Sequence, residues 1–333
     1  MDVFLTASLL TAIFVGIGIG ANTVPKAIGT VQCVLFKNYF KLALFLSIFI
    51  MLGGVLHSHS ISKTIGKGLI PSGNFEGNFR VVCILFLTTG LITLGLSFMG
   101  LPGSVSQIMV GSVLGVGLAM GLSEEIHYAL IFKIIAAWVS TPILACAITY
   151  LIYKTIVPFI EDKTGIVNFS RICMLLTLLG AIIISYDIGA NNVGVILGPL
   201  VGSDLLPETN IFGIILTPRT TMALAIGLLL SFGAILLGEP IARTVGKKIC
   251  MLDPISAFSS QLGAGIVIYL FINFGIPVST GQAVLGGISG VSLSRGKKFF
   301  GNKIMGKIVI LWLSTPLLAL GLSALLYRII VIL

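Results

Sequence analysis

The chain has 333 residues, of which 56% are hydrophobic and only 9% are Asp, Glu, Lys or Arg. An ordinary soluble domain carries about 25% charged residues, so this composition excludes a soluble globular fold. The formal net charge is +9, but the basic residues fall in short loops between apolar stretches, which indicates membrane topology rather than nucleic-acid binding. The five cysteines are scattered singly without a CxxC motif, so neither zinc sites nor disulfide frameworks are supported.

Stretches of roughly 20 residues that are almost free of charge recur along the chain, and each is long enough to cross about 30 Å of hydrocarbon. The first of them follows an acidic residue, Asp2, and lacks the basic start of a signal peptide, so we take it as a membrane helix. We predict an all-α integral membrane protein with about 10–12 membrane segments. Clear examples of these apolar stretches are residues 3–21, 42–56, 81–101, 211–237 and 308–326.

Four short motifs occur twice, in the same order and at nearly constant spacing. Duplication of this kind is typical of secondary transporters built from inverted repeats. We therefore predict a first membrane repeat at 1–153, a polar connecting segment at 154–171 and a second, inverted repeat at 172–333. The matched pairs are 20–24 and 189–193, 63–67 and 243–247, 101–107 and 276–282, and 138–142 and 312–316.

One of the repeated motifs places Pro, Ser and Gln inside apolar sequence in both of its copies, at residues 102–107 (the first break) and 277–282 (the second break). Non-helical backbone at membrane depth is tolerated only where it is buried in protein or lines a cavity. The breaks therefore predict broken helices or re-entrant hairpins. A helix that restarts after Ser104 or Ser279 would aim backbone N–H groups and its positive dipole end into the cavity, which suits an anion.

A single polar cluster of this kind is also explained by ordinary packing between membrane helices. Two matched clusters, together with the repeated Gly-Ala-Asn motif, favour a binding site instead. Amide and hydroxyl groups supply neutral hydrogen-bond donors to an anion. We expect substrate contacts from Asn22, Thr23, Ser104, Val105, Ser106, Gln107, Asn191, Asn192, Ser279, Thr280, Gly281 and Gln282.

Asp187 lies four residues before Asn191, so a helix would place both side chains on one face. An ionisable group inside a membrane costs about 2.5–3.5 kcal/mol and is a functional candidate for that reason. We predict that Asp187 binds the coupling ion, with Asn22 and Asn191 as further ligands. His57 and His59 are two residues apart and would not share a helix face, so no metal site is expected, and no catalytic motif indicates an enzyme.

At these residues the sequence resembles the inorganic phosphate transporter (PiT) family, whose halves each carry a Gly-Ala-Asn-Asp signature and a Pro-Val-Ser-Thr-Thr-His hairpin motif. The match is most specific in the second half, at 243–249, 277–280 and 290–296. The resemblance covers nearly the whole chain. It implies two inverted repeats and cation-coupled uptake of an oxyanion.

The sequence departs from the family pattern where Thr23 and Asn192 replace acidic residues and where Gln107 and Gln282 replace histidines. Phosphate near neutral pH keeps a proton that a carboxylate can accept, whereas sulfate has none. We therefore predict a symporter that favours sulfate, with sodium-coupled phosphate symport as the alternative and an anion channel as a more remote one. The loss of carboxylates weakens sodium binding, so a proton is the favoured coupling cation.

The sequence also predicts where the protein lies and what it binds. We expect a multi-pass protein of the cytoplasmic membrane, with lipid around it and an inorganic anion, sulfate or phosphate, as its partner. No nucleic acid and no cofactor beyond the coupling cation, H⁺ or Na⁺, are expected, and a homodimer is left open.

Overall fold

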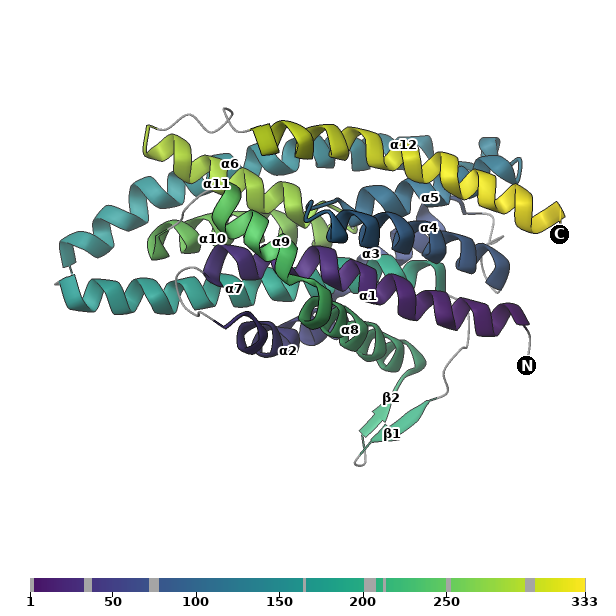
Figure 1. The fold of residues 1–333 in the computed structure, drawn as a ribbon, viewed down its shortest axis with the longest axis horizontal. Coiled ribbons are helices and arrows are strands. Elements are labelled where there is room, and N and C mark those ends of the chain that lie inside the picture. Colours follow the sequence, from purple (N-terminus) through teal and green to yellow (C-terminus); the bar gives the residue numbers. More distant parts are fainter. Residues whose placement is uncertain are drawn as a thin grey trace.

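A computed structural model describes residues 3–32, 38–71, 78–163, 166–200, 208–211, 214–249, 253–296 and 303–332. Within these ranges, eight helices are long and apolar enough to cross a membrane, so the chain is a multi-pass membrane protein. Several of them, including α1, α6, α7 and α12, run along the longest axis of the molecule (Figure 1). The eight are α1 (Val3–Gln32), α2 (Tyr39–His57), α4 (Phe79–Phe98), α6 (Tyr128–Lys163), α7 (Ile166–Leu197), α8 (Pro218–Leu237), α10 (Pro254–Asn273) and α12 (Lys303–Ile332).

Two apolar helices are shorter, α5 (Val105–Ala119) and α11 (Thr280–Ser294), each of 15 residues. At about 1.5 Å per residue such a helix is too short to cross the hydrocarbon layer. In the described part of the chain, these two and the eight long helices make up the membrane segments. Short helical pieces connect them: α3 (His59–Lys63) with η1 (Thr64–Gly68), η2 (Ser123–Glu125), η3 (Gly198–Leu200), and α9 (Glu239–Arg243) with η4 (Thr244–Ile249).

The expected all-α architecture holds for the membrane part of the protein. One antiparallel hairpin of two short strands, β1 (Thr209–Ile211) and β2 (Ile214–Leu216), precedes α8. It projects from the helices (Figure 1), and it is the one sheet among the described residues.

The second half of the chain repeats the element order of the first, so that α1 to α6 correspond in sequence to α7 to α12. The two halves are interlocked. Helix α1 packs on α4 of its own half and on α8 of the other, and α7 packs on α10 of its own half and on α2 of the other. Likewise α5 packs on α12, and α11 packs on α6. Each break therefore lies against helices from both halves.

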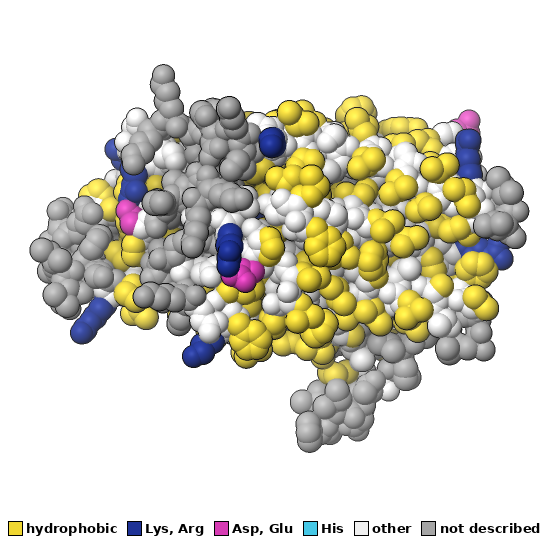
Figure 2. Space-filling model, viewed as in Figure 1, with side chains coloured by type: hydrophobic (Ala, Val, Ile, Leu, Met, Phe, Trp, Pro, Cys, Tyr) yellow, Lys and Arg dark blue, Asp and Glu magenta, His cyan; other side chains and the backbone are white. Residues whose placement is uncertain are grey.

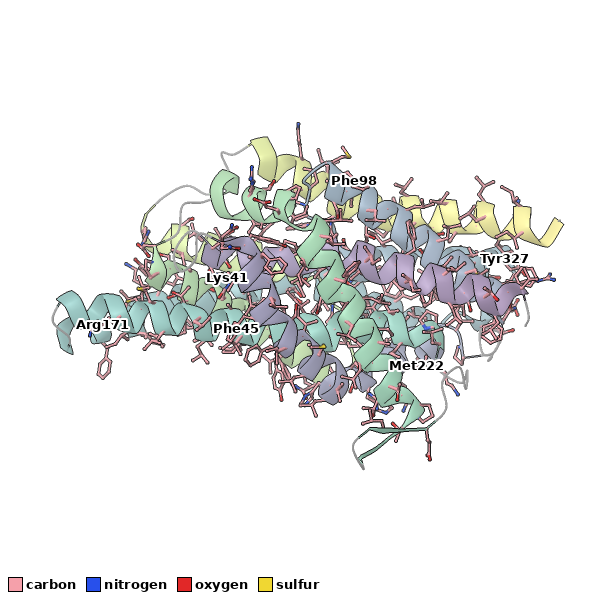
Figure 3. The ribbon with its side chains drawn as sticks, turned by 60° about the horizontal axis from the view of Figure 1, so that its bottom comes forward. Lys41, Phe45, Phe98, Arg171, Met222 and Tyr327 are labelled. Atoms are coloured by element: carbon pink, nitrogen blue, oxygen red, sulfur yellow. The ribbon has the colours of Figure 1, made fainter. Side chains whose placement is uncertain are left out.

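Helices α1 and α7 begin at opposite ends of the long axis. The N-terminus lies at one end of the molecule in Figure 1, whereas Arg171, near the start of α7, lies at the other end in Figure 3. The division of the chain at 154–171 stays a prediction from sequence. In the structure, α6 continues to Lys163 and α7 begins at Ile166.

Close approach of the two halves depends on glycine at matching positions. A Cβ added at Gly20 would lie 2.0 Å from the Leu230 carbonyl oxygen of α8, and one added at Gly189 would lie 2.0 Å from the Ile50 carbonyl oxygen of α2. Small residues allow membrane helices to pack backbone against backbone in this way. The first residue of each Gly-Ala-Asn motif is therefore required by packing.

The polarity of the protein is inverted relative to that of a soluble one. Hydrophobic side chains cover a broad area of the described surface (Figure 2), and large ones such as Phe132 and Leu313 are each 71% exposed. Polar side chains such as Asn22, Asp187 and Gln261 are buried. An apolar surface of this extent faces lipid, so the polar chemistry of the protein is concentrated in its interior.

Candidate functional site

The first break begins where α4 ends in a left-handed glycine. Gly100 has a φ of +66°, a conformation that glycine adopts without steric cost. Its N–H donates to the Ser97 carbonyl at 2.9 Å, and the Leu101 N–H donates to the Leu96 carbonyl at 2.9 Å. These bonds satisfy carbonyl groups at the helix end. Helix α5 then begins directly after Ser104, its N-cap residue.

The second break has the same geometry. Gly275 has a φ of +68°, and the Ile276 N–H donates to the Phe271 carbonyl at 2.9 Å. Helix α11 begins after Ser279, whose hydroxyl accepts the N–H of Gln282 at 3.3 Å. The helix restarts predicted after Ser104 and Ser279 are therefore confirmed, and both breaks present the N-terminus of a short helix to the interior.

The two Gly-Ala-Asn motifs hold the breaks in place. Asn22 accepts the Gly103 N–H of the first break at 2.9 Å and donates to the carbonyl of Leu101, the residue just before that break, at 3.2 Å. Asn191 donates to the Val278 carbonyl of the second break at 3.1 Å. The Asn191 amide oxygen is buried and has no hydrogen-bond partner within the described ranges. The repeated asparagines are thus in direct contact with the breaks of their own halves.

A residue that the sequence interpretation missed, Lys26, joins the two breaks. Its side chain is 1% exposed, and its Nζ donates to the Gly103 carbonyl at 2.6 Å. A Cβ added at Gly281 would lie 3.4 Å from the same Nζ. The Lys26 amino group therefore lies between the first and the second break. Lys26 follows Asn22 by one helical turn, and that spacing was the signal that could have identified it.

Several of the predicted substrate contacts are buried polar atoms with no partner. An unpaired buried polar group costs about 1–3 kcal/mol, so such a group calls for an explanation, of which an absent ligand is one. Three other predicted contacts, Val105, Thr280 and Gly281, are also buried. Within the described residues, the unpaired atoms among the predicted contacts are the side-chain oxygens of Thr23, Ser104 and Ser106 and the amide oxygens of Gln107, Asn191 and Gln282.

Asn192 is a predicted contact whose amide bonds within its own helix. Its amide donates to the Ile188 carbonyl in its own helix at 2.9 Å. Thr23, its counterpart in the first half, has the unpaired hydroxyl noted above. The two positions that replace the family's acidic residues are both buried, but they differ in hydrogen bonding.

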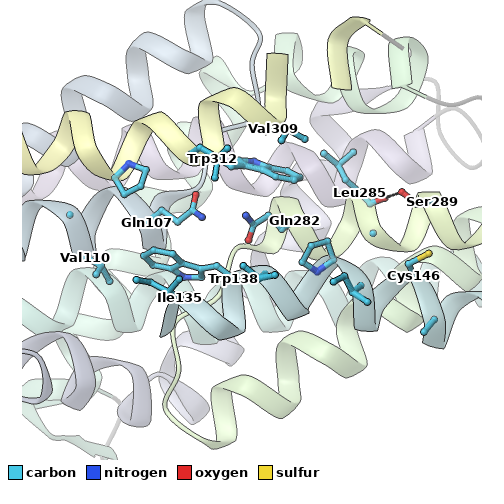
Figure 4. Close-up of a pocket in the computed structure, with 18 of the residues that line it drawn as sticks. Gln107, Val110, Ile135, Trp138, Cys146, Gln282, Leu285, Ser289, Val309 and Trp312 are labelled. Carbon is cyan, nitrogen blue, oxygen red and sulfur yellow. Dashed lines mark hydrogen bonds between the residues drawn. The ribbon is translucent and has the colours of Figure 1, made fainter. Parts of the chain in front are cut away.

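A groove of about 1050 Å³ lies beside the breaks, between α5, α6, α11 and α12. Gln107 and Gln282 point toward one another across it, with Trp138 and Trp312 on opposite sides (Figure 4). Its walls are mostly aliphatic, and a bare ion is too costly to transfer through such surroundings. We therefore do not take the groove as the ion path. The groove nevertheless shows that the ends of the two breaks, Gln107 and Gln282, face each other.

Asp187 lies on a separate cavity of about 360 Å³. Its carboxyl group is 1% exposed, and one of its oxygens has no partner in the described part of the chain. A Cβ added at Gly265 of α10 would lie 3.3 Å from that oxygen. The neighbouring Tyr186 hydroxyl bonds to a ring nitrogen of His57. Asp187 thus faces α10, whereas Asn191, one turn further along α7, contacts the second break.

The described residues contain no group of three or more His, Cys, Asp or Glu side chains that could hold a metal ion. Cys83, Cys146 and Cys173 are free thiols, and Cys33 and Cys250 lie outside the described residues. The site is thus made of amides, hydroxyls, helix N-termini and one lysine amino group.

Comparison with known proteins gives this geometry its context. A family model described as the phosphate transporter family matches residues 19–169 and 166–323. The chain belongs to the phosphate transporter family. The resemblance seen in the sequence is therefore confirmed, and the chain is an anion transporter rather than an enzyme. The two matches meet at residues 166–169, inside the predicted connecting segment.

Relatives of this phosphate transporter family member differ in the anion that their names give. The chain is 27% identical to Sulfate permease CysP of Bacillus subtilis over 96% of this chain and 86% of that protein. It is 25% identical to a protein of Methanocaldococcus jannaschii that is provisionally named a phosphate permease, over 99% of each chain. A solved structure, that of a sodium-dependent phosphate transporter, has the same fold, with a TM-score of 0.85, 20% identity and full coverage of both chains.

Proposed function

We propose that this protein is a symporter that carries a small inorganic oxyanion, sulfate in preference to phosphate, across the cell membrane together with protons. The observation that carries the proposal is the position of Lys26. Its amino group contacts Gly103 of the first break and lies against Gly281 of the second. Two helix N-termini and an amino group that can carry a positive charge therefore meet in the interior of a membrane protein.

The chemistry of this meeting point suits an anion. The N-terminus of each short helix carries partial positive charge and free N–H groups. Ser104 and Ser106 add hydroxyl groups that are buried and unpaired in the described structure. The two breaks contain no Asp or Glu, so they carry no negative charge that would repel an anion. We infer that the anion lies between residues 102–107 and 277–282.

The same composition supports sulfate over phosphate. The hydrogen phosphate ion has an O–H that needs an acceptor, and a carboxylate is the best one. The breaks offer Gln107 and Gln282 instead. The name of the Bacillus subtilis relative supports sulfate, whereas the name of the Methanocaldococcus jannaschii relative and that of the solved structure support phosphate as the second candidate.

Coupling is proposed to involve Asp187, the buried carboxyl group with an unpaired oxygen. A proton is favoured because the carboxyl lies in a cavity lined by Ile182, Ile183, Leu262 and two tyrosines, which offers few of the oxygen ligands that a sodium ion requires. The solved structure of the same fold is named as sodium-dependent, so sodium is the alternative. The opposite starts of α1 and α7 in Figures 1 and 3 support an inverted repeat that could expose the site to either side in turn.

Uptake of labelled sulfate and labelled phosphate into proteoliposomes tests the proposal. An inward proton gradient, without sodium, should drive accumulation of sulfate above the external concentration, and uptake should saturate. Excess unlabelled sulfate should suppress labelled sulfate uptake far more than excess phosphate does at pH 7. Uptake that only equilibrates would indicate a channel, and a strict sodium requirement would replace the proton with sodium in the proposal.

A further inference from the structure

We propose that Lys26 is itself a proton carrier of the transport cycle: it is neutral while the site is empty and charged while the anion is bound. This inference rests on the proposed anion site between the two breaks. It adds a second protonation site to Asp187 and assigns a coupling role to a residue that the family signature does not include.

The Lys26 amine is isolated from solvent and has few hydrogen-bond partners in the described structure. Its side chain is 1% exposed, and within the described ranges its Nζ has one hydrogen-bond partner, the Gly103 carbonyl. A charged ammonium offers three N–H groups, whereas a neutral amine offers two. One acceptor is therefore a poor environment for the charged form and an adequate one for the neutral form.

Lys26 also lacks a counter-ion among the residues that the structure describes. Lys26 is the one charged residue of α1, and α11, which carries Gly281, has no titratable residue. On the other elements packed against α1, Glu239 pairs with Arg243 at the surface and the Tyr39 hydroxyl donates to a backbone carbonyl. Asp187 faces Gly265.

Other charged groups near these elements also have other surroundings. Arg80 of α4 lies over the Phe4 ring, and Asp253 at the start of α10 pairs with Arg295. Arg219 lies at the N-terminal end of α8 and His57 at the C-terminal end of α2, where it bonds to Tyr186. In the described part of the chain, none of these groups forms an ion pair with Lys26.

The free energy of charging Lys26 depends on whether the anion is bound. An ammonium group without a counter-ion and out of contact with water carries a large desolvation cost. A bound oxyanion removes that cost because it forms short charge-assisted hydrogen bonds with the ammonium. The proton on Lys26 and the anion therefore strengthen each other's binding, and thermodynamic linkage makes the effect reciprocal.

The chemical step is a simple protonation. The Nζ lone pair forms an N–H bond with a proton taken from water on the side of entry, and the proton returns to water when the anion leaves on the other side. With Asp187 also protonated in the loaded state, one proton on each residue balances the charge of a sulfate ion. The formal charge of the buried site is then the same in the empty and the loaded state, so the membrane potential should not drive sulfate uptake.

Proton uptake on binding tests the inference directly. Purified protein in weakly buffered detergent solution receives potassium sulfate, with potassium chloride as the control, and a pH indicator reports the protons taken up. The parent should take up protons with sulfate alone. Asp187→Asn removes one carrier, so its uptake per bound sulfate should fall to about half. The double variant Asp187→Asn/Lys26→Arg should take up none, because the guanidinium is always charged.

The decisive comparison is between Asp187→Asn and the parent, since it does not require any change at Lys26. An Asp187→Asn protein that binds sulfate without taking up a proton overturns the inference, as does a double variant that binds sulfate and still takes one up. Sulfate affinity of Asp187→Asn should also fall as the pH rises, by up to about tenfold per pH unit. If the parent binds neither sulfate nor phosphate, the proposed function itself fails, which is a distinct result.

Discussion

Lys26 and Gly281 come from different halves of the chain, yet a Cβ at position 281 would lie 3.4 Å from the Lys26 Nζ. That distance is an ordinary contact, so Gly281→Ala should fold normally. The added methyl group would cover one side of the ammonium. We expect sulfate affinity to fall about tenfold, the equivalent of one lost hydrogen bond to a charged group.

Gly321→Ala is the matched control for that change, because a Cβ there meets nothing within 4 Å. Sulfate binding by the two variants can be measured by isothermal titration calorimetry. Equal affinities would place the anion away from Lys26.

The N-cap serines of the two short helices should behave differently. Ser279 accepts the Gln282 N–H, whereas the Ser104 hydroxyl is unpaired in the described structure. Ser279→Ala should therefore cost about 1 kcal/mol of stability through the lost cap and also weaken sulfate uptake about tenfold. Ser104→Ala should weaken uptake by a similar factor without lowering stability. Thermal unfolding and uptake kinetics on the same preparations separate these effects, and unchanged apparent affinity in both variants would remove the serines from the site.

Gly20 should tolerate no side chain. Its Cβ would lie 2.0 Å from a backbone oxygen of Leu230, which cannot move without shifting α8. We expect Gly20→Ala to lose about 3 kcal/mol or more of stability through overpacking. Gly95→Ala, in an exposed part of α4 with nothing within 4 Å, should instead gain up to about 1 kcal/mol from helix propensity. Thermal unfolding in detergent compares the two, and similar stabilities would contradict the backbone contact between α1 and α8.

Asp187→Asn should separate binding from accumulation. The neutral amide resembles the protonated carboxyl in hydrogen-bonding capacity, so sulfate should still bind. Accumulation driven by a proton gradient should fall steeply, because position 187 can no longer release its proton and Lys26 alone carries one proton per sulfate. Proteoliposome uptake with and without a proton gradient measures both properties. Full proton-driven accumulation by this variant would exclude Asp187 as a carrier.

Asp253, at the N-terminal end of α10, should make the stability of the fold depend on pH. Burial acts to raise the pKa of Asp253, but hydrogen bonds from Ser256 and Arg295 and the charge of Arg295 hold it below its ordinary value. A carboxyl group with a lowered pKa stabilises the fold above its unfolded-state pKa of about 3.9, and that stabilisation is lost as the pH falls through the lower folded-state value. The difference in Tm between the parent and Asp253→Asn should therefore be larger at about pH 7 than at about pH 3.

Arg295 also donates to the Tyr153 hydroxyl at 2.9 Å, so the ion pair links α6, α10 and the end of α11. Tyr153→Phe keeps the carboxylate and serves as the control for the pH series. A difference between parent and Asp253→Asn that does not change with pH would show that the ion pair contributes nothing.

Much of the architecture could be predicted because it depends on local chemistry. Proline, glycine and serine within apolar sequence identified both breaks, and the structure restarts its helices directly after Ser104 and Ser279. Duplication indicated that the two breaks are equivalent. The structure agrees, because Gly100 and Gly275 share a left-handed conformation, which glycine adopts without steric cost.

The site itself depended on contacts between the halves, which no local pattern reports. Lys26 looks like one more basic residue near the end of an apolar stretch until α1 is packed against α8 and α11. Asn22 was predicted to bind the ligand, and the sequence did not show that its amide also bonds to Gly103 and Leu101. The spacing of Asp187 and Asn191 correctly placed them one turn apart, but it could not show that neighbouring positions of α7 contact different partners.

The two tryptophans of the groove are equivalent in sequence and unequal in structure. Trp138 donates to the Pro277 carbonyl at 3.0 Å, while the buried Trp312 N–H has no partner in the ranges that the structure describes. Pro102 is the counterpart of Pro277 in the first half. A chain whose halves exchanged their conformations would therefore tether Pro102 to Trp312 and release Pro277. The tryptophan that holds a break proline would then indicate which of the two halves has which conformation.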